Sequence, residues 1–235
     1  MKKLPVEYVD VRKKYILFKN DQGVTTSARN GWIYEDFMYR HLKEIGTDLT
    51  GTNVIDIGGN FGFHTLEFAD LAGHVHSFEP QKIIYYQLCG NIVLNGYTNI
   101  TAYNVALDDS ASPHKMLMEN PDYTSEDPIN IGNSHLNAWI HNGNNEVEVR
   151  SLDSYEFDNV SFMKIDVQGY EVSVLNGARN TISKNRPVIF IEVEDGQLSI
   201  YGYKPEDIFS ILDELEYSYT KIGVYDYLAL PNERF

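Results

Sequence analysis

Thiols, cations and long apolar runs are scarce in this chain. A single cysteine, Cys89, stands among 235 residues, which excludes an internal disulfide and a thiolate metal cluster. No run of 18 apolar residues occurs, so we expect no membrane-spanning helix. Lysine and arginine number 19 against 34 aspartates and glutamates, and the net charge of −15 argues against binding to a nucleic acid backbone.

Sequence signals of three other classes are also missing. The first residues lack the apolar segment of a secretory signal, so we expect a cytoplasmic protein. The P-loop signature Gly-x-x-x-x-Gly-Lys-Ser/Thr is absent, and no His-x-x-x-His pair predicts a zinc site. The remaining composition, with 43% hydrophobic and 13% aromatic residues, is typical of a globular protein.

A glycine-rich turn within residues 53–64 is the most informative stretch. Residues 53–57 have the pattern of a buried strand, and the order Asp56-x-Gly58-x-Asn60-x-Gly62 follows without completing the dinucleotide pattern Gly-x-Gly-x-x-Gly. Asparagine tolerates positive φ better than most residues. Such a turn lets a ligand approach the backbone, and a turn that binds nothing is the alternative. The binding candidates are Asp56, Gly58, Gly59, Asn60, Phe61 and Gly62.

Strand-like and helix-like stretches alternate from residue 52 onward. This alternation predicts an α/β fold, in which a parallel sheet carries helices on both faces. Residues 217–221 and 225–230 are expected to pair as a terminal antiparallel hairpin. The other expected strands are 53–57, 74–79, 100–105, 162–166 and 187–192, and the expected helices are 34–44, 61–71, 82–94, 170–183 and 205–214.

Two segments stand outside this alternation. Residues 8–11 and 15–18 alternate like strands, so we expect residues 1–30 to form a β-hairpin extension that covers one edge, with a turn at 20–23. Residues 108–146 are rich in Asn, Ser, Asp, Pro and Gly, with strand-like pieces near each end, and long loops of this kind are usually functional or disordered. We expect a loop excursion on the substrate side, within a single domain spanning residues 1–235.

Acids and amides stand at the predicted carboxyl ends of the strands, where open α/β sheets bind ligands. Glu79 follows the second strand at the distance from the glycine turn at which an acid accepts both ribose hydroxyls; capping of the next helix is the alternative. No lysine or arginine lies beside the turn, so the ligand need not carry phosphates. These features favour S-adenosylmethionine, a cationic sulfonium cofactor, over a nicotinamide cofactor.

Charged residues occur in two strands that should be deeply buried. Phe162, Lys164 and Asp166 share one face of a strand, and Phe190 and Glu192 repeat the pattern in the next. Buried charges are costly unless paired, so one interpretation is a structural Lys164–Glu192 ion pair. A second is a catalytic floor, in which Asp166 or Glu192 accepts a hydroxyl proton and Lys164 orients its neighbour. A third places Mg²⁺ or Mn²⁺ on Asp166 and Glu192.

Eight ordered blocks resemble the FkbM family of S-adenosylmethionine-dependent O-methyltransferases over most of the chain after residue 50. Gly59 stands where alanine is frequent in that family, and Gln168 where glutamate is frequent. The blocks are Val54-Ile-Asp-Ile-Gly-Gly-Asn-Phe-Gly-Phe-His-Thr65, Ser77-Phe-Glu-Pro80, Asn91-Ile-Val-Leu-Asn-Gly96, Asn104-Val-Ala-Leu107, Ser151-Leu-Asp153, Met163-Lys-Ile-Asp-Val-Gln-Gly-Tyr-Glu171, Val174-Leu-Asn-Gly-Ala178 and Ile191-Glu192.

The resemblance implies a class I Rossmann-like methyltransferase fold, with a seven-stranded, mostly parallel sheet and a final antiparallel strand. It implies that the turn at 56–62 holds the methionine part of the cofactor. It also implies that Glu79, followed by Pro80, binds the ribose and that Asn104 and Ala106 lie near the adenine, with Asp166 beside the cofactor.

The resemblance further implies methyl transfer to a hydroxyl, and we expect a sugar in a glycan or glycolipid as the acceptor. Asp166 is the expected base, with Lys164 and Glu192 in support. The alternatives are a polyketide or other small-molecule hydroxyl, a nicotinamide-dependent oxidoreductase and a non-enzymatic cofactor-binding protein. The base-methylation motif Asn/Asp-Pro-Pro-Tyr is absent, which argues further against a nucleic acid partner, and a homo-oligomer is compatible with the sequence.

Overall fold

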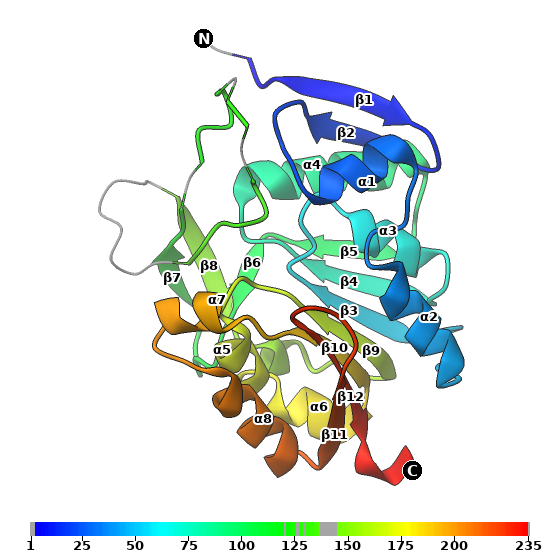
Figure 1. The fold of residues 1–235 in the computed structure, drawn as a ribbon. Helices are drawn as coiled ribbons and strands as arrows, with labels where there is room; N and C mark the ends of the chain where they lie inside the picture. The colour runs from blue at the N-terminus through cyan, green and yellow to red at the C-terminus, as the bar shows by residue number, and fades with distance from the viewer. Residues whose placement is uncertain (1–2, 120, 126, 129, 137–144, 235) are drawn as a thin grey trace.

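The computed structural model describes residues 3–119, 121–125, 127–128, 130–136 and 145–234. Its centre is a seven-stranded sheet in the order β11-β12-β10-β9-β3-β4-β5 (Figure 1). Strand β12 is antiparallel to both neighbours, and the remaining pairs are parallel, which confirms the predicted mostly parallel sheet. The strands are β3 (Asn53–Ile57), β4 (His74–Phe78), β5 (Ile100–Tyr103), β9 (Val160–Ile165), β10 (Val188–Glu192), β11 (Tyr217–Lys221) and β12 (Asp226–Pro231).

Helices cover both faces of this sheet, because the central strands are apolar on both sides. Alternate residues of each strand enter different layers: Ile55 packs with α5, α6 and α8, whereas Val54 packs with α2 and α3. Lys164 shares the parity of Phe162, which packs on the α2–α3 side. The helices are α2 (Asp36–Glu44), α3 (Phe63–Ala69), α4 (Lys82–Asn95), α5 (Glu171–Asn176), α6 (Arg179–Asn185), α7 (Asp195–Ile200) and α8 (Pro205–Glu214), and 3₁₀ segments cover Leu152–Tyr155 and Asn232–Arg234.

The N-terminal extension is an antiparallel hairpin of β1 (Val6–Asp10) and β2 (Lys14–Phe18), as predicted. It does not pair with the edge strand β5 of the large sheet but lies on helix α4, where Asn91 Oδ1 accepts a hydrogen bond from Ile16 N at 2.7 Å. The hairpin reverses at residues 11–13, and the predicted turn at 20–23 leads into helix α1 (Val24–Asn30).

Two predicted elements are broken by contacts with distant residues. The strand expected at 100–105 divides into β5 and β6 (Val105–Leu107), because the amide of Asn104 donates to the carbonyls of Glu79 and Pro80, both at 2.9 Å. The helix expected at 170–183 divides into α5 and α6 at Gly177, where a Cβ would lie 1.7 Å from the Asp108 carbonyl oxygen.

Strand β6 leaves the large sheet and joins a small one in the order β6-β8-β7. Its other strands, β7 (His114–Leu117) and β8 (Glu146–Arg150), correspond to the strand-like pieces predicted in the 108–146 excursion. Leu117 pairs with Glu146, so the excursion leaves and rejoins the small sheet at one point. Residues 120, 126, 129 and 137–144 of the excursion lie outside the described part. In the part of the chain described, no helix is long and apolar enough to cross a membrane.

Candidate active site

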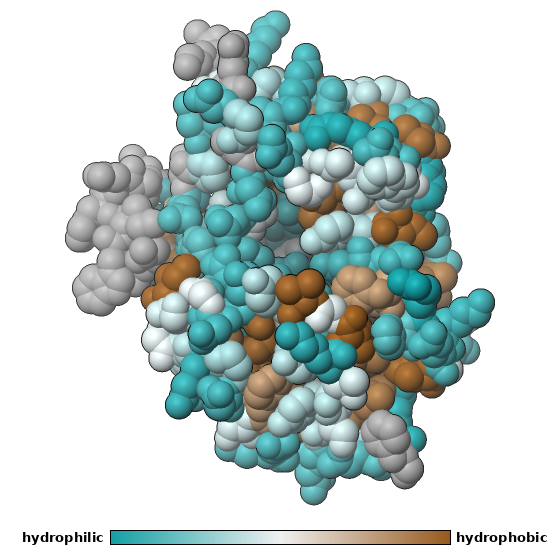
Figure 2. Space-filling model, in the orientation of Figure 1, coloured by the Kyte–Doolittle hydropathy of each residue, from teal (hydrophilic) through white to brown (hydrophobic). Residues whose placement is uncertain are grey.

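A cavity of about 400 Å³ opens at the carboxyl ends of the parallel strands. Figure 2 shows it as a hollow near the middle of the molecular face, with mostly hydrophilic surface around it. Its size is typical of small-molecule sites, and its position is the one at which open α/β sheets bind ligands. The predicted site residues that line it are Gly58, Asn60, Glu79, Pro80, Ala106, Asp166 and Glu192.

The glycine turn forms one wall of the cavity. Gly58 N and Gly59 N both donate to the carbonyl oxygen of Phe78, at 3.0 and 2.9 Å, so the turn is fixed to the end of β4. Asn60 has a φ of 49°, and its side-chain Oδ1 accepts from Phe61 N at 2.7 Å. Asparagine therefore serves here because its short polar side chain stabilises the left-handed backbone.

Several residues of the same turn lie behind the cavity instead of lining it. Asp56 is 1% exposed, and its Oδ2 accepts from Thr65 Oγ1 at 2.5 Å. Thr65 Oγ1 is 2.9 Å from Ser77 Oγ, which would stand 2.1 Å from a Cβ on Gly59. The Ser77 hydroxyl thus explains why glycine stands at position 59. The predicted residues that do not line the cavity are Asp56, Gly59, Phe61, Gly62, Asn104 and Lys164.

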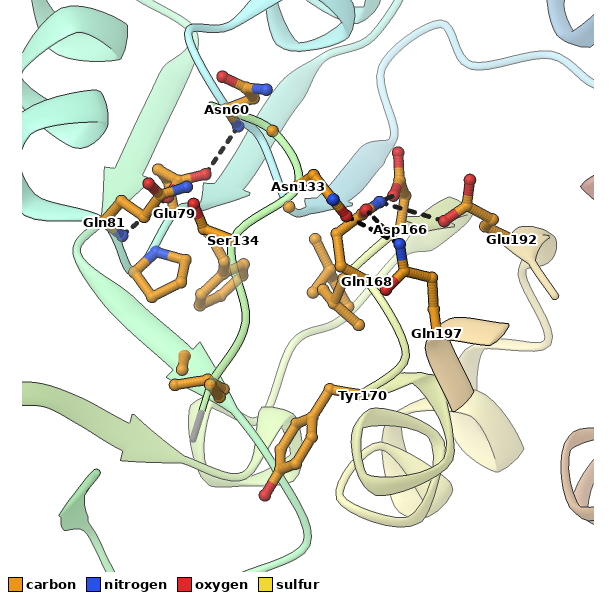
Figure 3. Close-up of a pocket in the computed structure, with 18 of the residues that line it drawn as sticks. Asn60, Glu79, Gln81, Asn133, Ser134, Asp166, Gln168, Tyr170, Glu192 and Gln197 are labelled. Atoms are coloured by element: carbon orange, nitrogen blue, oxygen red, sulfur yellow. Dashed lines mark hydrogen bonds between the residues drawn. The ribbon is translucent and has the colours of Figure 1, made fainter. Parts of the chain in front are cut away.

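Glu79 lies at one end of the cavity and is almost fully buried. Its carboxylate accepts from two backbone groups, Asn60 N at 3.0 Å and Gln81 N at 2.7 Å (Figure 3). Gln81 is the N-cap residue before helix α4, and no side-chain capping hydrogen bond is formed there, so Glu79 fixes the turn between β4 and α4 and does not cap the helix. Burial raises the pKa of Glu79 to about 7, against the opposing effect of both backbone donors.

Asp166 and Glu192 meet at the opposite end, bridged by one amide. Gln168 Nε2 donates to Asp166 Oδ1 at 2.9 Å and to Glu192 Oε2 at 3.2 Å (Figure 3). The other oxygen of Asp166 accepts from Lys164 Nζ at 2.9 Å. The buried ion pair therefore joins Lys164 to Asp166 and not, as one interpretation had it, to Glu192. The Lys164 side chain is 2% exposed, but that of Asp166 keeps 26% exposure toward the cavity.

The two carboxyl groups differ in protonation because only one of them has a cationic partner. Burial alone would raise the pKa of Asp166, but attraction and a hydrogen bond from Lys164 bring it below its usual value. Burial raises the pKa of Glu192 to about 10, and the negative charge of Asp166 adds to this rise. Near neutral pH, Asp166 is therefore ionised and Glu192 protonated, which is the separation that acid–base sites use.

The arrangement does not fit a divalent cation at Asp166 and Glu192. The ammonium of Lys164 and the amide of Gln168 already occupy both oxygens of Asp166 and one oxygen of Glu192 at hydrogen-bond distance. Nor does any group of three or more His, Cys, Asp or Glu side chains gather elsewhere as potential ligands, among the residues that the structure places. We derive no chemical step through Mg²⁺ or Mn²⁺.

Glu171 fixes the loop that carries Asp166 and Gln168, a role that the sequence analysis did not assign. Its Oε1 accepts from Val167 N at 3.0 Å and from Gly169 N at 3.1 Å. Burial raises the pKa of Glu171 to about 7. Between pH 4.5 and 7, Glu171 is therefore protonated in the folded protein but ionised in the unfolded chain. Because the folded state binds the extra proton, the free energy of unfolding falls as the pH rises through this window.

Replacement of Glu171 by glutamine is expected to remove this pH dependence. One amide oxygen can still accept both backbone hydrogen bonds. Between pH 5 and pH 8 the unmodified protein should lose about 2 kcal/mol more stability than Glu171→Gln, from 1.36 kcal/mol per pKa unit. Denaturant unfolding at both pH values measures the difference. Burial lowers the pKa of His76 to about 4, but the contribution of His76 to the pH dependence is the same in Glu171→Gln and in the unmodified protein, so it cancels in their comparison. Parallel stability curves would contradict the assignment.

Residues 130–136, which we call the strap, cross the cavity between its two ends (Figure 3). At one end, Ile131 N donates to Asp21 Oδ1 at 3.1 Å, and Gln81 Nε2 donates to the Ile131 carbonyl oxygen at 3.3 Å. At the other, Gln197 Nε2 donates to Asn133 Oδ1 at 2.8 Å. None of these lining residues was predicted individually, because their contacts join segments 50 or more residues apart.

The model of the methyltransferase FkbM domain matches residues 56–219. No curated protein matches the chain. Among solved structures, it is similar to the methyltransferase FkbM from Methylobacillus flagellatus KT, with a TM-score of 0.50 and 18% identity, covering 77% of this chain and 43% of that one. It thus spans less than half the length of that protein, and the likeness shows the Rossmann-like fold of class I methyltransferases.

Two further structures are more distant. Magnesium protoporphyrin IX methyltransferase from Synechocystis PCC 6803, solved with bound SAM, has a TM-score of 0.49 and 13% identity, covering 83% of this chain and 77% of that one. A SAM-dependent methyltransferase from Aquifex aeolicus has a TM-score of 0.46 and 14% identity, with coverages of 84% and 88%. Since the family model matches well over half of its residues, the chain belongs to the FkbM methyltransferase family.

Proposed function

We propose that the protein transfers a methyl group from S-adenosylmethionine to a hydroxyl of a neutral sugar, in a glycan or glycolipid. The observation that carries this proposal is the pair Asp166 and Glu192, which Gln168 joins at one end of the cavity and of which only Asp166 is hydrogen-bonded to a cation, Lys164. Glu79 stands at the other end, so one cavity has a place for the cofactor and a place for the reacting hydroxyl (Figure 3).

The lining residues fit this cofactor. Glu79 offers a buried carboxylate where ribose hydroxyls can bind it. Phe78, Val105 and Leu107 add an apolar surface next to it, suitable for an adenine ring. The ionised Asp166 complements a sulfonium cation. When bound, the cofactor supplies an electrophilic methyl group.

The chain's own residues supply positioning and proton transfer. Asp166, being ionised, accepts the proton of the acceptor hydroxyl as that oxygen reacts. Lys164 holds the Asp166 carboxylate in place and keeps it ionised. Glu192, in its protonated state, can donate a hydrogen bond to the acceptor. Gln168 keeps the two carboxyl groups at a fixed separation.

A neutral acceptor is favoured by the charges around the cavity. The described lining residues include no lysine, arginine or histidine, whereas Asp166 and Glu194 are acidic and Glu192, when protonated, adds no positive charge. An anionic sugar would meet no cation there and would be repelled. Amide side chains of Asn133, Gln168 and Gln197 line the same end and can both donate to and accept from sugar hydroxyls.

A methyl-transfer assay over paired acceptors tests this function. We expect methylation of neutral hexosides, observed as the mass increase that accompanies conversion of one hydroxyl to a methyl ether. The matching uronic acids should show at least about tenfold lower kcat/KM, since each carries an unpaired carboxylate into an acidic site. A macrolide alcohol, included in the panel, tests the polyketide alternative. Transfer to the macrolide alone, or to the uronic acids as readily as to the neutral sugars, would refute the proposed acceptor.

A further inference from the structure

A chain of hydrogen-bonding side chains leads from Asp166, at one end of the cavity, toward the molecular surface. Gln168 donates to Asp166 through its Nε2, and its Oε1 lies 3.5 Å from Gln197 Nε2 (Figure 3). Gln197 Oε1 in turn lies 2.6 Å from Nε2 of His135, in the strap. His135 Nδ1 is 3.1 Å from Oε2 of Glu119, which stands just after strand β7. We call Gln168, Gln197, His135 and Glu119 the polar chain.

Gln197 joins the strap to the loop that carries Gln168. Its amide is bonded to two strap residues, since it also donates to Asn133 Oδ1 at 2.8 Å. Its backbone is fixed as well, because the Gln197 carbonyl oxygen lies 2.2 Å from where a Cβ on Gly169 would stand. The His135 side chain is 13% exposed, so water does not readily replace the bond between His135 and Gln197.

The direction of each hydrogen bond follows from the two ends of the polar chain. The carboxylates of Asp166 and Glu119, when ionised, can only accept. A glutamine amide donates through its nitrogen and accepts through its oxygen, so Gln168 and Gln197 both point their nitrogens toward Asp166. Between two accepting ends, one group must therefore donate on both sides. His135 does so only as the imidazolium, with protons on Nδ1 and Nε2.

A neutral imidazole would leave one link of the polar chain without a proton. With the proton on Nε2, the lone pair of Nδ1 faces Glu119 Oε2, which also accepts from His135 N at 3.1 Å. With the proton on Nδ1, Gln197 must turn its amide and present its oxygen to the oxygens of Gln168 and Asn133. The first change loosens the strap, and the second removes the support of the Gln168 amide.

The titratable groups around the polar chain are Asp166 at the end of β9, Glu171 of α5, Glu192 of β10, Glu119, and Glu194 and Tyr201 at the two ends of α7. Burial raises the pKa of Tyr201, so its hydroxyl stays neutral. Glu171, with a pKa of about 7, titrates in the range in which histidine side chains ordinarily change charge. A pH effect of His135 is therefore identified by comparing variants that all retain Glu171.

We propose that His135, as the imidazolium, is a positioning residue for methyl transfer. It donates to Glu119 and Gln197 at the same time, and Gln197 then supports the Gln168 amide in its bridging orientation. This inference rests on the proposed function, since Gln168 joins the two carboxyl groups at which the acceptor hydroxyl is proposed to react. His135 contacts neither of these carboxyl groups and takes no part in the chemistry.

Methyl transfer to a neutral hexoside, measured from pH 5.5 to 8.5, tests the positioning role. The kcat of the unmodified protein should fall at least about threefold as His135 loses its proton, because the Gln168 amide is then held less firmly. His135→Gln donates to Gln197 through its amide at every pH and should lose this pH dependence. His135→Ala should lower kcat at least about tenfold throughout, and the affinity for S-adenosylhomocysteine should change less than about threefold.

His114→Gln is the matched control. His114 also faces a carboxylate, with Nε2 at 3.4 Å from Asp108 Oδ2, but it does not line the cavity and is not part of the polar chain. The variant should retain both kcat and its pH dependence. A kcat profile in His135→Gln that follows the unmodified protein, full kcat in His135→Ala, or an equal loss in His114→Gln would overturn the proposal.

Nuclear magnetic resonance of protein saturated with S-adenosylhomocysteine provides a test that needs no turnover. With ¹⁵N in the histidine and glutamine side chains, His135 should show protons on both nitrogens at pH 5.5. The side-chain amide signal of Gln168 should shift as His135 loses its proton, and also in His135→Ala. A single proton on His135 at pH 5.5, or a Gln168 signal indifferent to both changes, would overturn the proposal. If the Gln168 signal responds and no hexoside is methylated, His135 positions Gln168 and the proposed acceptor is wrong.

Discussion

Replacement of Asp166 by asparagine should lower turnover by about 10²- to 10⁴-fold, the usual contribution of a positioned general base. Asparagine keeps an oxygen that can accept from Gln168, but it carries no charge and takes up no proton from the hydroxyl. Cofactor affinity should change by less than about tenfold, so that the loss appears in kcat. Single-turnover methylation and calorimetry with S-adenosylhomocysteine measure the two effects separately.

The same substitution leaves Lys164 buried without a counter-ion, which can cost about 3–5 kcal/mol of stability. The double variant Lys164→Met/Asp166→Asn removes both charges and serves as the folding control. It should be at least as stable as Asp166→Asn and equally inactive. If either variant retained turnover near that of the unmodified protein, Asp166 would not be the base.

Replacement of Gly58 by alanine should destabilise the protein by about 3 kcal/mol or more, through overpacking and a strained backbone. Gly58 has a φ of +87°, and a Cβ there would lie 1.9 Å from the backbone carbonyl oxygen of Asp166. The clash cannot be relieved by a side-chain movement, so the glycine turn and the end of β9 would have to separate. Cofactor binding should be lost together with stability, because both strand ends line the cavity.

Gly46→Ala is the matched control for this substitution. Gly46 has a similar φ of +67°, but no atom lies within 4 Å of the position a Cβ would take. It should therefore show only the cost of a left-handed alanine, about 1–2 kcal/mol. Denaturant unfolding of both variants isolates the clash from the strain. Equal losses in Gly46→Ala and Gly58→Ala would show that backbone strain alone matters at the turn.

The parallel strands of the large sheet were predicted from local patterns, because strands buried on both faces are continuous apolar runs. Phe162 and Lys164 were predicted to share a face from their spacing, and they do, with Lys164 opposite both Asp56 and Phe190 in the pairing register. The prediction that acidic residues at the strand ends lie close together needed no knowledge of side-chain contacts, since parallel strands end at the same edge of the sheet. Asp166 and Glu192 are accordingly joined by Gln168.

The predictions that were wrong concerned residues whose conformation depends on contacts with residues distant in sequence, which a local pattern does not contain. Asn104 interrupts a strand because of carbonyls at residues 79 and 80, and Gly177 interrupts a helix because residue 108 passes close by. Helix α1 was missed because Val24, Thr25 and Thr26 are β-branched and have low helix propensity. The sequence also did not decide whether Lys164 pairs with Asp166 or with Glu192, because this depends on the positions of the side chains at the end of β9.

The pairing of Leu117 with Glu146 has a consequence for how this enzyme family can diversify. A segment whose two ends are adjacent in a hairpin can lengthen at little cost, since doubling a loop adds only about 0.6 kcal/mol of closure entropy. The large sheet, which supports the strand ends around Glu79 and Asp166, does not include this junction. Residues 118–145 can therefore change in length without changing the register of the large sheet.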